Sequence, residues 1–277
     1  MTAETSREPV LVQSLTNRVM TLRFNDPRKK NAWGAEMLEA LLSSLNRAAS
    51  DPSVSVVILT GTGDYYCSGV DFVSSFPVMR PSLLVEHLHA SNQRLFDTFI
   101  LFPKPIIVAA NGPAIGASVT SATLCDAILA SPTASFHTPF AALGIVPEGC
   151  SSYWFEKVMG VDASNRMLGT EGWRPTAAEA HAAGFVRQVI GSGDVLAAAQ
   201  VMGENWASSG RRRSVVEQGE VPTLLKVNAA ESKALARAFV DTKFLSAMHE
   251  AARAKGKTKL AAAFWVLMHT RPLWSRL

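Results

Sequence analysis

The chain has 277 residues, 48% of them hydrophobic and 18% charged, with a formal net charge of +4 and an isoelectric point near 9.1. This composition excludes an intrinsically disordered chain and allows a sizeable buried core. The mild positive charge suits a small anionic ligand, and it lacks the concentrated basic stripe of a nucleic-acid-binding protein.

Three widely spaced cysteines, Cys67, Cys125 and Cys150, form no C-x-x-C pair. Their number and spacing argue against a disulfide framework or a zinc site and favour a reducing compartment. The first nine residues lack the apolar core of a secretory signal, and a Pro/Gly turn interrupts the uncharged stretch 105–125. We therefore expect no signal peptide, no membrane span and no metal site.

The hydrophobic pattern predicts strands alternating with helices up to about residue 195. Apolar runs bounded by turn residues predict strands at 10–14, 18–24, 54–60, 106–110, 127–130, 135–137 and 186–190. Apolar positions at helical spacing predict helices at 35–49, 83–101, 117–124, 151–159, 163–169 and 176–183. This alternation indicates an α/β fold.

Beyond residue 195 the strand pattern disappears. Helical spacing covers 196–206, 221–248 and 258–268, and the stretch 210–219 is a polar, charged loop. We therefore divide the chain into an α/β core, residues 1–195, and a C-terminal helical region, residues 196–277. The helical region either covers the core or joins subunits, and periodicity does not distinguish these two roles.

Glu148 is the carboxylate of a Pro/Gly turn, residues 146–152, in a stretch that holds very few charges. Burial beside apolar chain disfavours the ionised form, so its pKa should rise toward the range useful for proton transfer. The ordinary interpretation is a glutamate in the first turn of a helix, where it complements the helix dipole. Local sequence alone favours that ordinary interpretation.

Two glycine-bearing loops follow predicted strands, at 64–71 and at 111–117. Glycine lets backbone N–H groups approach a ligand closely, as an oxyanion hole requires, and the second loop ends at a helix N-terminus with unpaired N–H groups. Taken singly, the first reads as an ordinary strand-to-helix turn, and helix capping explains the second equally well.

Other catalytic arrangements find little support in the sequence. His87 and His89 lie two residues apart, on different faces of a helix, and His137 reads as a core or turn residue. Ser151 and Ser152 lack the G-x-S-x-G elbow of a nucleophile. The phosphate-binding and dinucleotide-binding glycine motifs are also missing, which disfavours nucleotide hydrolysis and dinucleotide redox chemistry.

Between Thr16 and Ile190 the chain resembles the crotonase (enoyl-CoA hydratase/isomerase) superfamily. The matching pieces, in order, are Asn25-Asp26-Pro27, Lys30-Asn31-Ala32, residues 57–63, Cys67-Ser68-Gly69-Val70-Asp71, Lys104-Pro105, Asn111-Gly112-Pro113-Ala114-Ile115-Gly116, Cys125-Asp126 and residues 136–149. The resemblance implies a core of repeated ββα units arranged in a spiral, with C-terminal helices that form trimers or hexamers.

The resemblance also implies an enoyl-CoA thioester as substrate, with its carbonyl oxygen bound by two backbone N–H groups. Carried over by position, these donors are Ser68 and Ala117. Coenzyme A enters as part of the substrate, so no separate cofactor is expected. The implied residues for binding the coenzyme and substrate are Lys30, Ala32, Tyr66, Cys67, Ser68, Gly69, Val70, Asp71 and Phe140.

The departures from the family pattern indicate the reaction. Family hydratases carry glutamates at the positions that Thr120 and Phe140 occupy here, and neither of these side chains can transfer a proton. The run 137–152 instead looks like the peroxisomal Δ3,Δ2-enoyl-CoA isomerases, whose catalytic glutamate matches Glu148. The alternatives are another isomerase or a thioester hydrolase on the same scaffold, and a non-catalytic scaffold that binds acyl-CoA, RNA or a protein.

The C-terminal residues Ser275, Arg276 and Leu277 are a conservative variant of the Ser-Lys-Leu peroxisomal address. We therefore expect a peroxisome or a related, glycosome-like organelle and a peroxisomal import receptor as a partner. The cytosol and the mitochondrion are the alternatives.

Overall fold

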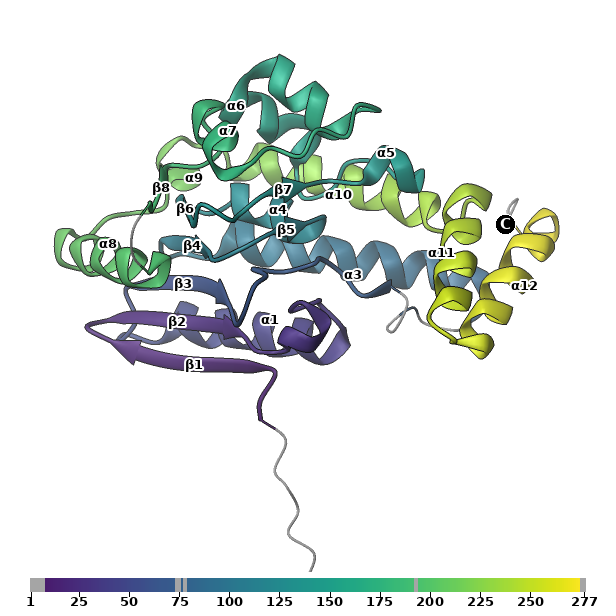
Figure 1. The fold of residues 1–277 in the computed structure, drawn as a ribbon, viewed down its shortest axis with the longest axis horizontal. Coiled ribbons are helices and arrows are strands. Elements are labelled where there is room, and N and C mark those ends of the chain that lie inside the picture. The colour runs from purple at the N-terminus through teal and green to yellow at the C-terminus, as the bar shows by residue number, and fades with distance from the viewer. Residues whose placement is uncertain (1–7, 73–75, 77–78, 192–193, 275–277) are drawn as a thin grey trace, which may run out of the picture.

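A computed structural model describes residues 8–72, 76, 79–191 and 194–274 of the chain (Figure 1). Its main sheet has six strands in the order β1-β2-β3-β4-β6-β8. The strands are β1 (Leu11–Thr16), β2 (Val19–Phe24), β3 (Val56–Gly61), β4 (Ile106–Ala110), β6 (Ala127–Ala130) and β8 (Gln188–Val189). Only the β1–β2 hairpin is antiparallel among these six, because the later strands are joined by helical crossovers. The predicted α/β class is confirmed.

Twelve short segments of helix cover and extend this sheet within the described residues. They are the 3-10 helix η1 (Pro27–Lys29), α1 (Ala35–Ser50), α3 (Pro81–Leu101), α4 (Ala117–Thr123), α5 (Phe140–Leu143), α6 (Ser151–Leu168), α7 (Ala177–Ala182), α8 (Val195–Ser209), α9 (Ser214–Glu217), α10 (Val221–Ala238), α11 (Thr242–Ala254) and α12 (Thr258–Trp274).

The two faces of the sheet pack against different helices because successive strand residues point to opposite sides. On β3, Val57 and Leu59 belong to the core that includes α1, whereas Val56 and Ile58 pack in a second cluster with α8. Gly203 of α8 lies against β2, and a Cβ there would approach Val19 to 3.0 Å. The proposed domain boundary therefore falls at the start of a helix that covers the main sheet.

A second, two-stranded parallel sheet lies beside the main one and leads into α4. It pairs β5 (Ala114–Ile115) with β7 (Phe136–His137). The loop that follows β3 extends this pairing, because Cys67 forms a bridge with Ala114 and its carbonyl accepts a hydrogen bond from Ile115 N at 3.0 Å. The glycine-bearing loops predicted from the sequence are thus held against one another.

A buried ion pair ties the C-terminal region to the core. Arg213 and Asp126 are 0% and 1% exposed, and Arg213 Nε lies 2.9 Å from Asp126 Oδ2. Arg213 also donates to three backbone carbonyls, of Phe99, Phe102 and Leu124, so the buried charge is fully surrounded by acceptors. Asp126 in turn accepts from the backbone N–H of Ile106 at 2.8 Å. The Cys-Asp motif of the sequence therefore has a structural role here.

Two details of the helices test the sequence predictions. The helices expected at 151–159 and 163–169 are confirmed as two segments of α6, which breaks at Gly160 with φ 80° and ψ 164°. The continuous helix expected at 221–248 is wrong, because α10 ends and α11 begins again after Asp241, whose side chain caps Thr242 N. Within the loop predicted at 210–219, residues 214–217 form α9.

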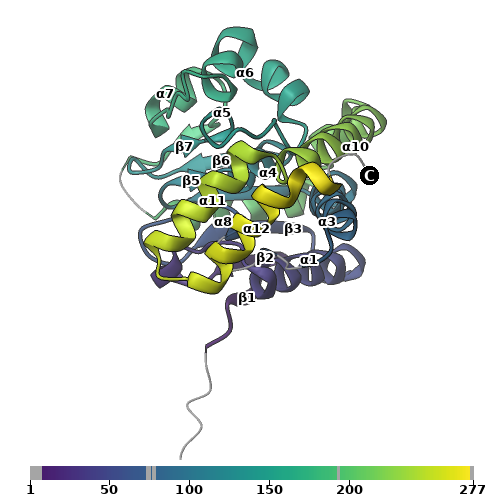
Figure 2. The same ribbon diagram turned by 90° about the vertical axis from the view of Figure 1, so that its right-hand side faces the viewer.

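Helix α11 lies beside α12 (Figure 2), α10 and α12 contact α3, and aromatic side chains of this region form a cluster beside the core. α11 and α12 lie side by side, and Phe239, Phe244 and Phe264 are buried between them and α3. Within the described ranges, none of the helices combines the length and apolar character that a membrane crossing requires. The C-terminal tripeptide, residues 275–277, lies outside the described residues.

Candidate functional site

Glu148 lies in a tight turn that leads into α6. Gly149 and Cys150 both adopt left-handed backbone conformations, with φ of 64° at each. A Cβ on Gly149 would lie 2.5 Å from the Phe96 ring and 2.8 Å from Thr120 Oγ1, so only glycine fits between these groups. The turn is therefore pressed against α3 and α4, and this packing fixes the position of Glu148.

A second carboxylate, Glu231 of α10, holds the same turn from the other side. Its two oxygens accept from the backbone N–H groups of Cys150 at 2.6 Å and Ser152 at 2.9 Å, at the N-terminus of α6. A carboxylate is favourable at this end of a helix because it satisfies unpaired N–H groups and complements the helix dipole. Glu231 therefore acts as a distant cap for the helix that Glu148 precedes.

The Glu148 side chain is 5% exposed and receives a single hydrogen bond from the described side chains, from Asn92 Nδ2 to Oε2 at 2.7 Å. Burial raises its pKa from the ordinary 4.5 to about 7, the Asn92 hydrogen bond opposes this rise, and the nearby Glu231 charge adds to it. A carboxyl group with this pKa exists in both protonation states near neutral pH. It can therefore accept a proton and return it.

Glu148 faces a cavity of about 530 Å³ between α1, α3 and the loop after β3. This volume falls in the usual range for small-molecule sites. Most of the wall is apolar or aromatic, and the polar groups are few. The lining residues are Trp33, Ala35, Leu38, Glu39, Leu42, Val70, Phe72, Phe76, His87, Leu88, Ala90, Ser91, Asn92, Arg94, Leu95, Glu148 and Phe239.

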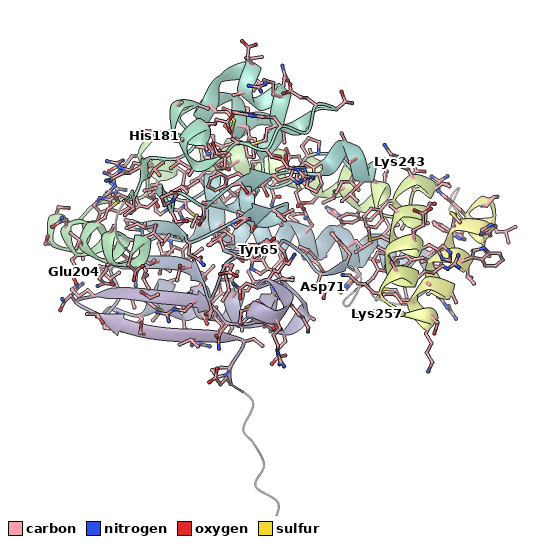
Figure 3. The ribbon with its side chains drawn as sticks, in the orientation of Figure 1. Tyr65, Asp71, His181, Glu204, Lys243 and Lys257 are labelled. Atoms are coloured by element: carbon pink, nitrogen blue, oxygen red, sulfur yellow. The ribbon has the colours of Figure 1, made fainter. Side chains whose placement is uncertain are left out.

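The loop after β3 forms the opposite wall of this site. Asn31 fastens it, since its Nδ2 donates to Thr62 O at 3.0 Å and to Tyr65 O at 2.7 Å. Tyr65 and Asp71, labelled in Figure 3, lie near the two ends of the loop, and Asp71 is on the side of the C-terminal helices. The segment thus runs from the basic turn before α1 toward α11 and α12.

Gly69 brings this loop into contact with the start of α4. It has φ 83°, and a Cβ there would lie 2.5 Å from Ile115 O. The close approach places the peptide groups after Gly69 beside Gly116 and Ala117. Two backbone segments that are far apart in sequence therefore meet next to the cavity, as an oxyanion hole requires.

One of the two backbone N–H groups predicted as oxyanion donors, that of Ser68, is not free. Ser68 N–H donates to Lys30 O at 3.0 Å, so its hydrogen is already engaged by the chain. Among the described residues, no acceptor is bound by the N–H groups of Val70 and Ala117. Val70 also lines the cavity that contains Glu148. The geometry replaces Ser68 with Val70 as the first candidate donor and retains Ala117 as the second.

Three of the expected ligand-binding side chains are buried away from the cavity. Tyr66 and Cys67 are 0% exposed, and the Tyr66 ring packs on Phe24 at 5.5 Å between centroids. Burial raises the pKa of the Cys67 thiol to about 12, so it is not a thiolate. Phe140, the first residue of α5, is 2% exposed and does not line the cavity. These three residues therefore belong to the core, and only their backbone could reach a ligand.

The remaining expected residues lie on the accessible side of the loop. Lys30 is exposed in a left-handed turn at the end of η1, with its ammonium 4.8 Å from the Tyr65 ring centre. Ala32 is half-buried, and its N–H donates to Lys29 O at 3.1 Å. The N–H of Asp71 donates to Trp33 O at 3.1 Å. A basic, accessible turn thus lies next to the loop that carries Val70.

Sequence reasoning missed the partners of Glu148. Asn92 carried a usable signal, because it interrupts the apolar face of α3 between Leu88 and Leu95, four and three residues away. Glu231 similarly falls on the buried side of α10, where a carboxylate needs a partner. Across the described residues, no cluster of three or more His, Cys, Asp or Glu side chains is placed to hold a metal ion.

The comparisons with known proteins agree with this architecture. The family model described as enoyl-CoA hydratase/isomerase matches residues 14–259. A solved structure of enoyl-CoA hydratase/isomerase from Pseudoalteromonas atlantica T6c is 29% identical, with a TM-score of 0.73 over 90% of this chain and 97% of that one. The chain belongs to the enoyl-CoA hydratase/isomerase family, and its crotonase fold is confirmed.

Curated relatives cover part of this chain. Enoyl-CoA delta isomerase 2 of Homo sapiens is 43% identical over 184 residues, 65% of this chain and 46% of the relative. Enoyl-CoA delta isomerase 3, peroxisomal, of Mus musculus is 39% identical over 176 residues, 62% and 54%. Testis-specific chromodomain protein Y 1 of Homo sapiens is 36% identical over 195 residues, 69% and 35%. The chain thus spans about half, or less, of the length of these relatives.

The raised pKa of Glu148 predicts a pH-dependent stability. The folded state binds this proton more tightly than the unfolded state, so stability is full below pH 4.5 and falls as the pH rises through about 7. The loss amounts to roughly 3 kcal/mol, since one pKa unit is about 1.4 kcal/mol. Glu148→Gln should therefore gain stability relative to wild type between pH 4.5 and 8, as measured by urea unfolding.

Glu179→Gln serves as the matched control with the opposite sign. Glu179 is exposed, and its hydrogen bonds from Thr176 lower the pKa of its carboxyl group. The stability that ionised Glu179 contributes is present above its ordinary pKa and is lost as the pH falls. The variant lacks this contribution, so its stability relative to wild type should decrease as the pH rises. A Glu148→Gln difference that is the same at every pH would contradict the raised pKa.

Proposed function

We propose that this member of the enoyl-CoA hydratase/isomerase family is a Δ3,Δ2-enoyl-CoA isomerase, which shifts a 3-enoyl-CoA double bond to give trans-2-enoyl-CoA in the β-oxidation of unsaturated fatty acids. One observation carries the proposal: a buried carboxyl group, Glu148, with a pKa near 7 faces an apolar cavity. The other described carboxylate of the lining, Glu39, is 67% exposed and paired with Arg94 at 3.3 Å.

The reaction needs one base that becomes an acid. Protons at C2 of a 3-enoyl thioester are acidified by both the carbonyl group and the alkene. In the proposed mechanism Glu148 removes a C2 proton, and the electron pair spreads over the dienolate to the thioester oxygen. The resulting glutamic acid returns the proton to C4, which leaves the double bond between C2 and C3 and regenerates the carboxylate.

The dienolate oxygen needs hydrogen-bond donors that are already oriented. In this proposal the N–H groups of Val70 and Ala117 supply them, because both are free in the chain and lie where the two loops meet. Such donors stabilise the charge that develops during proton removal. They require no metal and no redox cofactor, and coenzyme A takes part only as a portion of the substrate.

The coenzyme portion is proposed to lie over the basic turn before α1. Lys30 is exposed there, and the half-buried Ala32 leads directly into the cavity wall at Trp33. A cationic turn attracts the phosphates of the coenzyme, while the apolar wall accepts the acyl chain. Two parts of one ligand would thus occupy two neighbouring surfaces of different polarity.

Water addition is disfavoured because the side chains at positions 120 and 140 cannot transfer a proton. The Thr120 hydroxyl donates to Ala117 O at 3.3 Å and packs against Gly149, and Phe140 is buried in α5. Neither of these positions supplies the acid or the base that a hydratase needs. The proposal of isomerisation over hydration rests on these two side chains.

The second candidate function is a scaffold that binds an acyl-CoA or a partner without turnover. The similarity to testis-specific chromodomain protein Y 1 favours it, since the name of that relative is not that of an enzyme. Retention of a buried carboxyl group and two free N–H groups supports the catalytic alternative. Turnover of a 3-enoyl-CoA would decide between them.

Assembly and location stay predictions. We propose a homotrimer or hexamer formed through the C-terminal helices, which carry the exposed side chains Trp265 and Leu273 on α12. We also propose a peroxisomal location, supported by the name of the mouse relative, which includes the word peroxisomal. The import receptor would read Ser275, Arg276 and Leu277, which lie beyond the described residues.

Glu148→Gln should abolish isomerisation, with kcat at least about a thousandfold lower, because an amide cannot accept the C2 proton. Binding of a coenzyme A thioester should persist, as measured by calorimetry, because the variant keeps the size of the side chain and its contact with Asn92. Product analysis with a 3-enoyl-CoA checks the reaction in the wild type. Near-normal turnover by the variant would sink the proposed mechanism.

Ala117→Pro removes one proposed oxyanion donor while keeping the helix. Ala117 is the first residue of α4, where proline is tolerated because its N–H is outside the helical ladder. We expect kcat to fall roughly a hundredfold with little change in thermal unfolding. Ala117→Gly retains the N–H and is the control. Equal activity of the two variants would remove Ala117 from the mechanism.

Deletion of residues 275–277 tests the proposed location. The truncated protein, expressed as a fluorescent fusion at its N-terminus, should stay in the cytosol while the full chain enters peroxisomes. Microscopy with a peroxisomal marker measures this, and unchanged import of the truncated protein would refute the assigned signal.

A further inference from the structure

A chain of partly buried hydrogen bonds runs from Glu148 along the contact between α3 and α10. Asn92 Nδ2 donates to Glu148, and Asn92 Oδ1 accepts from the hydroxyl of Ser232 at 2.8 Å. The same hydroxyl lies 3.2 Å from Asn228 Oδ1. Asn228 Nδ2 donates to Asp97 Oδ1 at 2.8 Å. Three side chains from two helices, Asn92, Ser232 and Asn228, thus connect Glu148 to the carboxylate of Asp97 on α3.

The contacts at the Asp97 end of this hydrogen-bond chain determine which way the Asn228 amide points. Asn228 Nδ2 faces two groups that can only accept, Gln93 O at 3.0 Å and the carboxylate of Asp97. Its Oδ1 must therefore point toward Ser232, because the opposite orientation would place three acceptors together. Asn228 and Ser232 are both 0% exposed, so water does not replace these contacts.

Ser232 has one hydroxyl proton and two carbonyl oxygens within reach. When it donates to Asn92 Oδ1, the Asn92 amide is oriented with its NH₂ group toward Glu148. Without that donor, Asn92 can invert and its oxygen can accept a hydrogen bond from the protonated carboxyl group of Glu148, which favours the protonated form. The direction of the Asn92 amide, and with it the hydrogen bond to the ionised form of Glu148, depends on Ser232.

We propose that Ser232 and Asn228 are positioning residues for Glu148, which hold the Asn92 amide so that it donates to the carboxylate. They touch neither the cavity nor the reacting atoms, since neither residue lines the cavity. Their side chains connect to Glu148 through Asn92. The inference rests on the proposed function for its kinetic readout only, because the hydrogen-bond chain exists whatever the substrate.

The other charged and titratable groups near Glu148 lie on three helices. They are Glu231 on α10, Asp97, His87 and Arg94 on α3, and Glu39 on α1. Of these, Glu231 raises the pKa of Glu148 directly. Substitution of Ser232 removes none of these charges, so a change in the titration of Glu148 in such a variant reports the hydrogen bond from Asn92.

The kinetic test compares Ser232→Ala, Ser232→Cys and wild type between pH 5 and 9. Ser232→Ala should lower kcat about tenfold at pH 6, because the loss of roughly one hydrogen bond to a charged group has an effect of this size. KM should change less than about twofold. The loss should shrink toward pH 9, where Glu148 is ionised in every variant. Ser232→Cys, with a weaker donor of similar size, should fall between the two.

Ser44→Ala is the matched control. Ser44 of α1 is also buried, and its hydroxyl donates to Ala40 O and accepts from Gln13, so this variant loses comparable contacts away from Glu148. Its kinetics should match wild type at every pH. A loss in Ser232→Ala that is constant with pH, or an equal loss in Ser44→Ala, would reduce Ser232 to a structural residue and overturn the proposal.

A titration that needs no turnover separates this proposal from the proposed function. Infrared difference spectra, with Glu148→Gln subtracted, follow the protonated carboxyl group of Glu148 in wild type and in Ser232→Ala. The midpoint should move to higher pH in Ser232→Ala, and an unchanged midpoint overturns the positioning role. A wild type that fails to isomerise 3-enoyl-CoA overturns the proposed function, while the shifted midpoint would still uphold the hydrogen-bond chain.

Discussion

The burial of one carboxyl group, Glu148, is the constraint on which the rest of the site depends. A charge away from water is costly, so the fold must hold the residue in place against the tendency of its turn to open. Two successive left-handed residues, Gly149 and Cys150, shape the turn, and Glu231 binds the N–H groups that follow. The C-terminal helix α10 therefore contributes to the site through the backbone of the turn that holds Glu148, without lining most of the cavity. Loss of α10 would release the turn together with its carboxylate.

The parallel sheet provides the second half of the site by bringing two loops together at one edge. β3 and β4 are neighbours with the register Val57 to Ile106, so the loops that leave them meet beyond their carboxyl ends. The contact of Gly69 with Ile115 O then leaves no room for a side chain, and the peptide groups approach closely. The sheet register and the close approach of Gly69 thus determine where the free N–H groups lie. The carboxylate, by contrast, is placed by helices, which allows its position to change while the loops stay constant.

The sequence predicts best where a single pattern decides the structure. Strand β4 begins and ends at the predicted residues, 106 and 110, because all five of its side chains are buried and form one continuous apolar run. The break between α10 and α11 could not be read from spacing, since Phe239 and Val240 continue the apolar pattern. At the break, Asp241 caps α11, and the Phe239 ring packs on Phe72 and Phe244, at 4.7 and 4.9 Å between centroids. Assignment of an oxyanion donor to Ser68 failed for a similar reason, because its N–H finds Lys30 O, a partner that no local pattern reveals.

The position of Glu148 follows from the groups that surround it. The turn that holds Glu148 contacts Thr120, so a longer side chain at position 120 would compete with Gly149 for the same space. A site with one carboxylate can move a proton between two carbons of a substrate, and a site with two can also activate and deliver water. The close packing of Thr120 on Gly149, with Phe140 in the core, thus leaves Glu148 as the one buried carboxyl group in the described lining of the cavity.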